Sequence, residues 1–203
     1  PYPALSDAPP VLIRTIDAHA GGQPLRLVVG GWPTPRGATM ADKRAWLERR
    51  ADQLRRTIVL EPRGHRDMCG AVLTEPTSPG AHAGVIFMHA DGYSALSGHG
   101  IIAVTTIVLE RGLLQPGGDE RTIVFDTAAG VVRATASLSG DHPPRVRGVV
   151  LTGVPAFVLH AGIAVKACSR QVRADVAFGG EAFAIVDAES VGLPLAPTHL
   201  PEI

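Results

Sequence analysis

Residues 94–101, Ser-Ala-Leu-Ser-Gly-His-Gly-Ile, bring a hydroxyl, an imidazole and two glycines together just before an apolar segment. Ser97 is a residue type that often caps a helix, and the first amides of a helix have no partners within it. Such amides bind carboxylates or phosphates, and glycines let a ligand approach the backbone closely. The run therefore predicts an anion site with Ser97 at its mouth, although, judged by position alone, a plain helix cap is the commoner reason for a serine there.

Two further clusters carry polar and ionisable side chains. Residues 17–26, Asp-Ala-His-Ala-Gly-Gly-Gln-Pro-Leu-Arg, are typical of a strand end and a glycine turn. Side chains at such a turn often face a cleft, but Asp17 could equally bond to its own turn. Residues 61–69, Glu-Pro-Arg-Gly-His-Arg-Asp-Met-Cys, are dense in ionisable groups, and such loops are more often solvated than functional. Neither cluster identifies a chemistry by itself.

Zinc binding and cysteine chemistry are the alternatives to anion binding. Possible zinc ligands are His65, Asp67, Cys69, His89 and His99, but their spacing matches no familiar zinc pattern, so we expect no metal. Cys69 could act as a nucleophile beside His65. Its apolar neighbours instead favour burial in a strand.

The elements that would position these residues are mostly strands. The chain has 23 Gly and 17 Pro, and the segments between turns are short and rich in Val, Ile and Thr. Predicted strands are 11–17, 25–29, 58–60, 71–74, 83–88, 121–127, 131–138, 145–151, 156–159, 171–177 and 182–187.

Two segments predict helices instead. Residues 40–56 place a few apolar side chains among charges at helical spacing, with Thr39 available as a cap, which indicates a surface helix. Residues 98–114 are apolar on nearly every side until Glu110, and Gly112 suits a helix end. A helix of that kind must be buried, most simply inside a wrapped sheet.

Composition excludes several classes of function. The chain has 203 residues, 45% of them apolar, which is enough for a real core. Lys and Arg together number 19, as do Asp and Glu, so no net positive charge attracts nucleic acid or an anionic membrane. No apolar run approaches the ~20 residues of a membrane span, and no signal-peptide pattern opens the chain. We therefore expect a cytoplasmic protein that binds a small molecule, with Cys69 and Cys168 both reduced.

A break in the pattern indicates two domains. Residues 115–119, Gln-Pro-Gly-Gly-Asp, form the best candidate linker, and a new series of strands follows them. We expect a first domain in residues 1–118 and a second that begins at residue 119.

Taken in order, residues 17–26, 61–68, 84–93 and 94–103 resemble the opening motifs of the proline racemase family, and residues 175–188 resemble a later signature of that family. The resemblance covers nearly the whole chain. It implies an α/β (α+β) diaminopimelate epimerase-like fold of two strand-rich, barrel-like domains, each around a central helix. An amino acid would bind between them without a cofactor. Residues 1–118 would then be a complete first domain and 119–203 the first part of the second, without its C-terminal catalytic half.

The resemblance also assigns roles at the turn. Racemases and 4-hydroxyproline epimerases of the family place two Cys, one per domain, on opposite faces of the substrate α-carbon. Ser97 stands where the first Cys is expected, and Gly98, His99 and Gly100 would bind the substrate. A thiol has a pKa of ~8.5 and an alcohol a much higher one, so Ser97 is a poor base and symmetric two-base racemisation is disfavoured.

We therefore expect a trans-3-hydroxy-L-proline dehydratase. The first alternative is a 4-hydroxyproline 2-epimerase or proline racemase-type epimerase, and the second is a catalytically incomplete fragment that binds proline analogues. Strand edges left open in an incomplete second domain would favour a homodimer.

Overall fold

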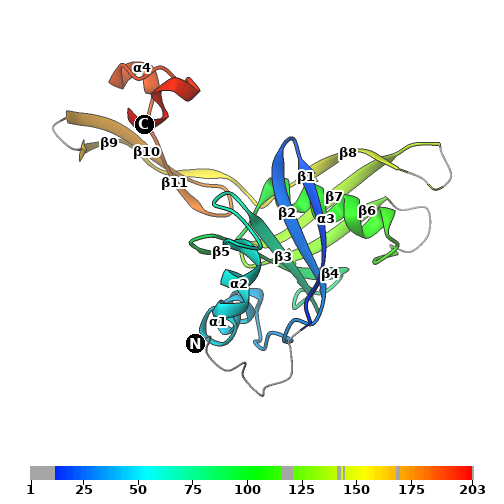
Figure 1. Cartoon of the computed structure of the whole chain (residues 1–203). Helices are drawn as coiled ribbons and strands as arrows, with labels where there is room; N and C mark the ends of the chain where they lie inside the picture. Colours follow the sequence, from blue (N-terminus) through cyan, green and yellow to red (C-terminus); the bar gives the residue numbers. More distant parts are fainter. Residues whose placement is uncertain (1–11, 116–120, 141–142, 144, 168–169, 203) are drawn as a thin grey trace, which may run out of the picture. The chain divides into compact units, whose positions relative to one another are not determined.

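The computed structural model describes residues 12–115, 121–140, 143, 145–167 and 170–202 (Figure 1). The chain divides into two compact units, Pro1–Thr152 and Gly153–Ile203, and each has its own sheet. No helix in the described part of the chain is long and apolar enough to cross a membrane.

The first unit is built on an eight-stranded mixed sheet. Its strands run in the order β1-β2-β3-β4-β6-β7-β8, and β5 pairs with β4. The pairs β2–β3 and β4–β6 are parallel, whereas the other neighbours are antiparallel. The strands are β1 (Arg14–Ala20), β2 (Gln23–Gly30), β3 (Cys69–Thr74), β4 (Ala83–His89), β5 (Gly92–Ser94), β6 (Thr122–Thr127), β7 (Gly130–Leu138) and β8 (Val146–Thr152).

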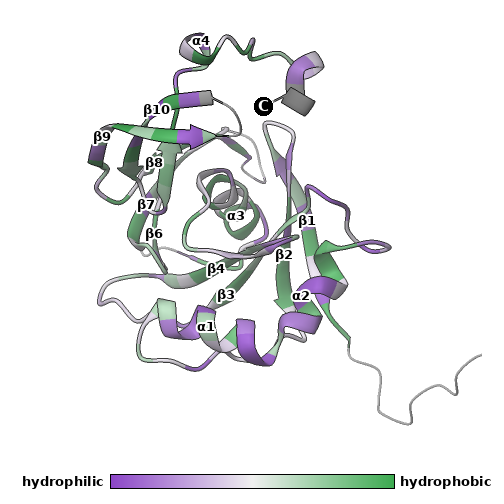
Figure 2. Cartoon of the chain, turned by 90° about the vertical axis from the view of Figure 1, so that its left-hand side faces the viewer, coloured by the Kyte–Doolittle hydropathy of each residue, from purple (hydrophilic) through white to green (hydrophobic). Residues whose placement is uncertain are grey.

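Helix α3 (Gly98–Glu110) lies within the curl of this sheet (Figure 2). Seven of its residues are buried, Ile101, Val104 and Val108 almost completely, so the predicted buried helix is confirmed. It ends four residues earlier than predicted. Gly112 has a φ of 62° there, and the amide of Leu113 turns back to the carbonyl of Val108.

Helices α1 (Met40–Arg50) and α2 (Asp52–Val59) cover the outer face of β2, β3 and β4 (Figure 2). Thr39 caps α1 in a capping box with Asp42, as its residue type predicted. The prediction of one surface helix over 40–56 was wrong in two respects. The helix breaks at Ala51, and its inner side is buried against the sheet.

The predicted strand 58–60 was also wrong, because Ile58 and Val59 form the last turn of α2. Both side chains pack among Val28, Val72 and Met88 of the sheet. A short apolar run is compatible with either a strand or a buried helix face, and only the partner distinguishes them.

The division between the two units lies further along the chain than the predicted boundary at residue 118. Strand β6 pairs with β4, and β7 and β8 follow it in the same sheet. Glu110 at the end of α3 also accepts a hydrogen bond from the amide of Val146 in β8. Strands β6 to β8 therefore complete the sheet around α3. Most of the predicted linker, residues 116–119, lies outside the described residues.

The second unit holds a three-stranded antiparallel sheet in the order β11-β10-β9. Its strands are β9 (Phe157–Ala167), β10 (Arg170–Phe178) and β11 (Ala182–Ile185), followed by a short helix α4 (Ala188–Val191) and a 3-10 turn at Pro197–Glu202. The three predicted strands are present, and β9 is eight residues longer than 156–159 indicated at its C-terminal end. Several large apolar side chains are exposed here, among them Phe157, Val158, Phe183 and Ile185.

Candidate functional site

Ser97 caps the N-terminus of α3. Its backbone is extended, with a φ of −137°, and its Oγ accepts a hydrogen bond of 3.1 Å from the amide of Gly100. The carbonyl of Ser97 accepts the amide of Ile101 at 2.9 Å. The predicted cap is therefore present, and Oγ keeps its own hydrogen available for donation to another group, because it accepts in the cap bond.

The first two amides of α3 are open to a ligand. Gly98 and His99 are exposed, and no acceptor for either amide lies among the residues that the structure describes. An α-helix N-terminus carries a partial positive charge. These amides can therefore receive a carboxylate.

The two glycines of the turn, Gly98 and Gly100, differ in how closely the rest of the chain packs around them. A Cβ on Gly100 would clash with the Phe87 ring and lie 2.9 Å from Ser97 Oγ, so packing inside the sheet requires glycine. A Cβ on Gly98 would meet only Leu151 Cδ2, at 3.8 Å. Packing within the chain thus leaves Gly98 free to vary, which is consistent with close approach of a ligand at that position.

Helix α2 positions the turn that leads to Ser97. The guanidinium of Arg55 is buried and donates to the carbonyls of His89 and Ala90 at 2.6 and 2.7 Å, which form the β4–β5 turn. It also pairs with Asp52 at 2.6 Å and lies over the ring of Tyr93. The hydrogen bond from Arg55 lowers the pKa of Asp52, whereas burial raises the pKa of the Tyr93 hydroxyl. Arg55 thus fixes β5, and β5 carries the chain to the cap.

Arg26 joins the two polar clusters, residues 17–26 and 61–69, to which the sequence assigned no chemistry. Its guanidinium pairs with Asp17 at 2.7 Å, and this hydrogen bond raises the pKa of Arg26. It also donates to the carbonyls of Ile58 and Arg63. Strand β1, the end of α2 and the loop 61–68 therefore meet at one arginine.

A second link between the clusters is made by Gln23 at the start of β2. Its Nε2 lies 3.4 Å from the carbonyl oxygen of Asp67 and 3.3 Å from Cys69 Sγ. Cys69 opens β3 and has a free thiol, so its predicted place in a strand is confirmed, but it is half-buried and not, as expected, fully buried. Cys168 lies outside the described residues. The sequence did not single out Gln23, because its contacts lie 44 and 46 residues away.

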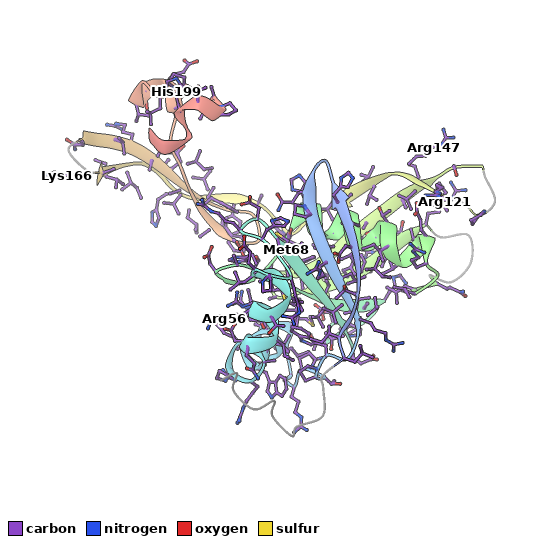
Figure 3. The ribbon with its side chains drawn as sticks, viewed as in Figure 1. Arg56, Met68, Arg121, Arg147, Lys166 and His199 are labelled. Carbon is purple, nitrogen blue, oxygen red and sulfur yellow. The ribbon has the colours of Figure 1, made fainter. Side chains whose placement is uncertain are left out.

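The remaining candidates are the residues considered as zinc ligands. Among the described residues, no group of three or more His, Cys, Asp or Glu side chains is arranged to hold a metal ion. His65 and His89 each accept an amide two residues on in the chain, from Asp67 and Asp91. These two imidazoles therefore order their own turns. Met68, labelled in Figure 3, is buried beside Ile58 and Val59 of α2.

A cavity of about 480 Å³ lies at the opposite end of the first unit. It is lined by the ends of β2 and β3, the segment 31–35 and Leu113 and Leu114 beyond α3. A helix of 13 residues is about 20 Å long. The cavity is therefore distant from Ser97.

Comparison with known proteins agrees with the motifs. The family model described as proline racemase matches residues 15–203. A trans-3-hydroxy-L-proline dehydratase of Bacillus cereus is 41% identical over 182 residues, which are 90% of this chain and 54% of that protein. A 3-hydroxyproline 2-epimerase of Burkholderia multivorans is 40% identical over 184 residues, with the same coverage of the two chains.

The fold agrees as well. A hydroxyproline epimerase from Agrobacterium vitis, solved with trans-4-hydroxy-L-proline bound, superposes with a TM-score of 0.84 at 33% identity. The match covers 92% of this chain and 55% of that one, and the chain spans about half the length of the curated relatives it matches. The mixed α/β architecture with a strand-rich, curled sheet is thus the one expected from the sequence. With the family model matched across residues 15–203, the chain belongs to the proline racemase family.

Proposed function

We propose that the protein dehydrates trans-3-hydroxy-L-proline to Δ1-pyrroline-2-carboxylate without a cofactor. The observation that carries this proposal is Ser97, which occupies the cap of α3 at the turn where the family's racemases are expected to have Cys. Relatives at 40–41% identity named trans-3-hydroxy-L-proline dehydratase support the choice.

In the proposed reaction the substrate carboxylate binds the amides of Gly98 and His99. A base removes the α-proton, and the negative charge that develops on the carboxylate is stabilised by the same two amides. The electrons form a C2=C3 double bond as the C3–O bond breaks, and the hydroxyl leaves as water with one proton. The resulting enamine tautomerises to the cyclic imine.

Ser97 would act as a hydrogen-bond donor in this scheme. Its Oγ accepts from Gly100, so its hydrogen can point toward the leaving hydroxyl or the carboxylate. Because an alcohol is a weak base, the α-proton would be removed by the family's second catalytic residue. No residue of this chain is assigned that role. Elimination needs a base on one face only, which suits this asymmetry.

Epimerisation of hydroxyproline is the second candidate. Two observations favour it, the relative named 3-hydroxyproline 2-epimerase and the structural similarity to a hydroxyproline epimerase. Epimerisation moves a proton from one face of the α-carbon to the other, so Ser97 would then have to exchange a proton itself.

Proton NMR in D2O separates the two reactions. Full-length protein is incubated with trans-3-hydroxy-L-proline and, separately, with trans-4-hydroxy-L-proline. We expect imine formation from the first and no inversion at the α-carbon of the second. Inversion and α-deuteration of 4-hydroxyproline without imine formation would establish the epimerase instead.

A catalytically incomplete binding protein is the third candidate. Calorimetric titration of the 203-residue chain with pyrrole-2-carboxylate, a planar analogue, tests whether the chain binds such ligands by itself. Binding without turnover of either substrate would favour this candidate. A homodimer and a cytoplasmic location stay predictions.

A further inference from the structure

Gln23 lies on the face of the first sheet that surrounds α3. Phe87 contacts the Gly100 position of α3, and Phe87 pairs with Ala71, which in turn pairs with Leu27. Paired residues share a face, and side chains two residues apart on a strand share it too. Gln23 and Cys69 therefore face the same side as Leu27 and Phe87.

Gln23 and Cys69 also lie toward the end of the sheet where α3 begins. Going from Leu27 to Gln23 along β2, and from Ala71 to Cys69 along β3, leads to the same edge because the two strands are parallel. On the neighbouring antiparallel strand, this edge corresponds to Met88 and His89, which lead into β5 and then Ser97. Gln23 is exposed there, whereas Leu25 and Leu27 are buried.

The orientation of the Gln23 amide follows from its partners. The carbonyl oxygen of Asp67 can only accept, so the Nε2 side of the amide must face it, and the second Nε2 hydrogen points to Cys69 Sγ. Oε1 then points elsewhere, and it has no donor among the residues that the structure describes. Gln23 therefore presents a fixed, unused acceptor at this edge of the inner face.

We propose that Gln23 Oε1 accepts a hydrogen bond from the ring hydroxyl of the substrate and so determines the preference for hydroxyproline over proline. The inference rests on the function proposed above. In this arrangement the carboxylate would bind the amides of Gly98 and His99, and the ring would lie on the side of Gln23. A ring hydroxyl is the one donor that hydroxyproline has and proline lacks, so an acceptor that meets it separates the two amino acids.

The test compares a substrate with a ligand that lacks the hydroxyl. In the full-length protein, kcat/KM for trans-3-hydroxy-L-proline is measured together with the inhibition constant of L-proline, a competitor. Gln23→Leu should lower kcat/KM by about 3- to 10-fold, the worth of one neutral hydrogen bond, while the inhibition constant of proline stays within about twofold. Gln23→Glu keeps an acceptor but loses the Nε2 donors that orient it, so it should retain only part of the preference.

Gln53→Leu is the matched control, since Gln53 is exposed on α2, which covers the outer face of the sheet. Equal losses for hydroxyproline and proline in Gln23→Leu, as a contact with the ring nitrogen or a structural role would produce, overturn the inference. So does the absence of any change. If wild-type protein forms no imine, the proposed dehydration fails instead, and calorimetric binding of the same two amino acids to wild type and Gln23→Leu tests the hydroxyl contact alone.

Discussion

At the scale of single residues, Ser97 combines a structural and a chemical role. Its Oγ satisfies one of the amides that open α3, and its hydrogen stays available to a ligand. The predictions for Ser97 must therefore separate loss of the cap from loss of the chemistry.

Replacing Ser97 with Ala should lower the free energy of unfolding by about 1 kcal/mol, because the cap bond is lost. It should also lower kcat for dehydration by about 100-fold or more, since a positioned proton donor is lost. Thr39→Ala is the control, because it removes the equivalent cap of α1. It should cost similar stability and leave kcat unchanged, as chemical denaturation and the imine assay together would show. Equal activity of the two variants would assign Ser97 a capping role alone.

The Ser97→Cys variant should acquire epimerase activity. A thiol at a helix N-terminus ionises far more readily than an alcohol and can act as a base. We expect the variant to invert the α-carbon of trans-4-hydroxy-L-proline, measured by NMR of the diastereomer that forms, and wild type to leave it uninverted. Inversion by wild type at a comparable rate would contradict the assignment of Ser97 as a non-base.

The glycines at the turn form a matched pair. Gly98→Ala should fold as stably as wild type, because its Cβ has room, but it should weaken substrate binding by about 10-fold if the substrate approaches the backbone there. Gly100→Ala should destabilise the first unit by about 2 kcal/mol, because the Cβ clashes with Phe87. Thermal unfolding and KM distinguish the two effects. Normal binding by a stable Gly98→Ala protein would place the carboxylate elsewhere.

At the scale of elements, Asp126 of β6 ties the loop between β3 and β4 to the sheet. Its carboxylate is buried and accepts from the amides and hydroxyls of Thr77 and Ser78, at distances from 2.6 to 3.0 Å. Burial raises the pKa of this carboxyl, but the hydrogen bonds from Thr77 and Ser78 together lower the pKa by more than burial raises it. The net pKa therefore lies below the usual value. The ionised form therefore stabilises the fold.

The lowered pKa of Asp126 determines how the stability of the fold depends on pH. The stabilisation from Asp126 is fully present above the unfolded-state pKa of about 4 and is lost as the pH falls through the lower folded-state pKa. Asp126→Asn should cost about 3 kcal/mol at pH 7, and the difference from wild type should shrink in acid below that pKa. Urea unfolding across pH checks this, with exposed Asp91→Asn as the control. A difference that stays constant with pH would show that shape, and not charge, is what Asp126 contributes.

At the scale of the whole molecule, the first unit contains every strand of the eight-stranded sheet together with α1, α2 and α3. The three-stranded sheet of the second unit leaves large apolar side chains exposed, Phe157 and Phe183 among them. The two units therefore differ in how completely each buries its own apolar surface.

Residues 1–152 produced alone should fold. We expect one cooperative thermal transition, followed by circular dichroism, because the core around α3 needs no strand from the second unit. The fragment should also bind less of a hydrophobic dye than the 203-residue chain, since the exposed apolar side chains of β9 and β11 are absent. A fragment without a cooperative transition would show that the first unit depends on the second.

Much of the site could be predicted from local sequence. Ser97 as a cap and the apolar helix behind it follow from residue type and periodicity over a few turns, and both are present. The ionisable clusters could not be interpreted in that way. Arg26 meets Arg63, and Gln23 meets Cys69, only because β2 and β3 pair in parallel across a crossover that contains α1 and α2.

The family, the buried helix, its cap and most of the strands could be inferred from the sequence, because they depend on side-chain patterns that repeat over short distances. Three features depend on tertiary contacts instead. These contacts place Ile58 and Val59 in a helix, extend the first sheet through β8 to Thr152, and bring Gln23 to the edge where α3 begins. Each depends on which distant strand supplies the partner, and that choice lies in the packing of the whole unit around α3.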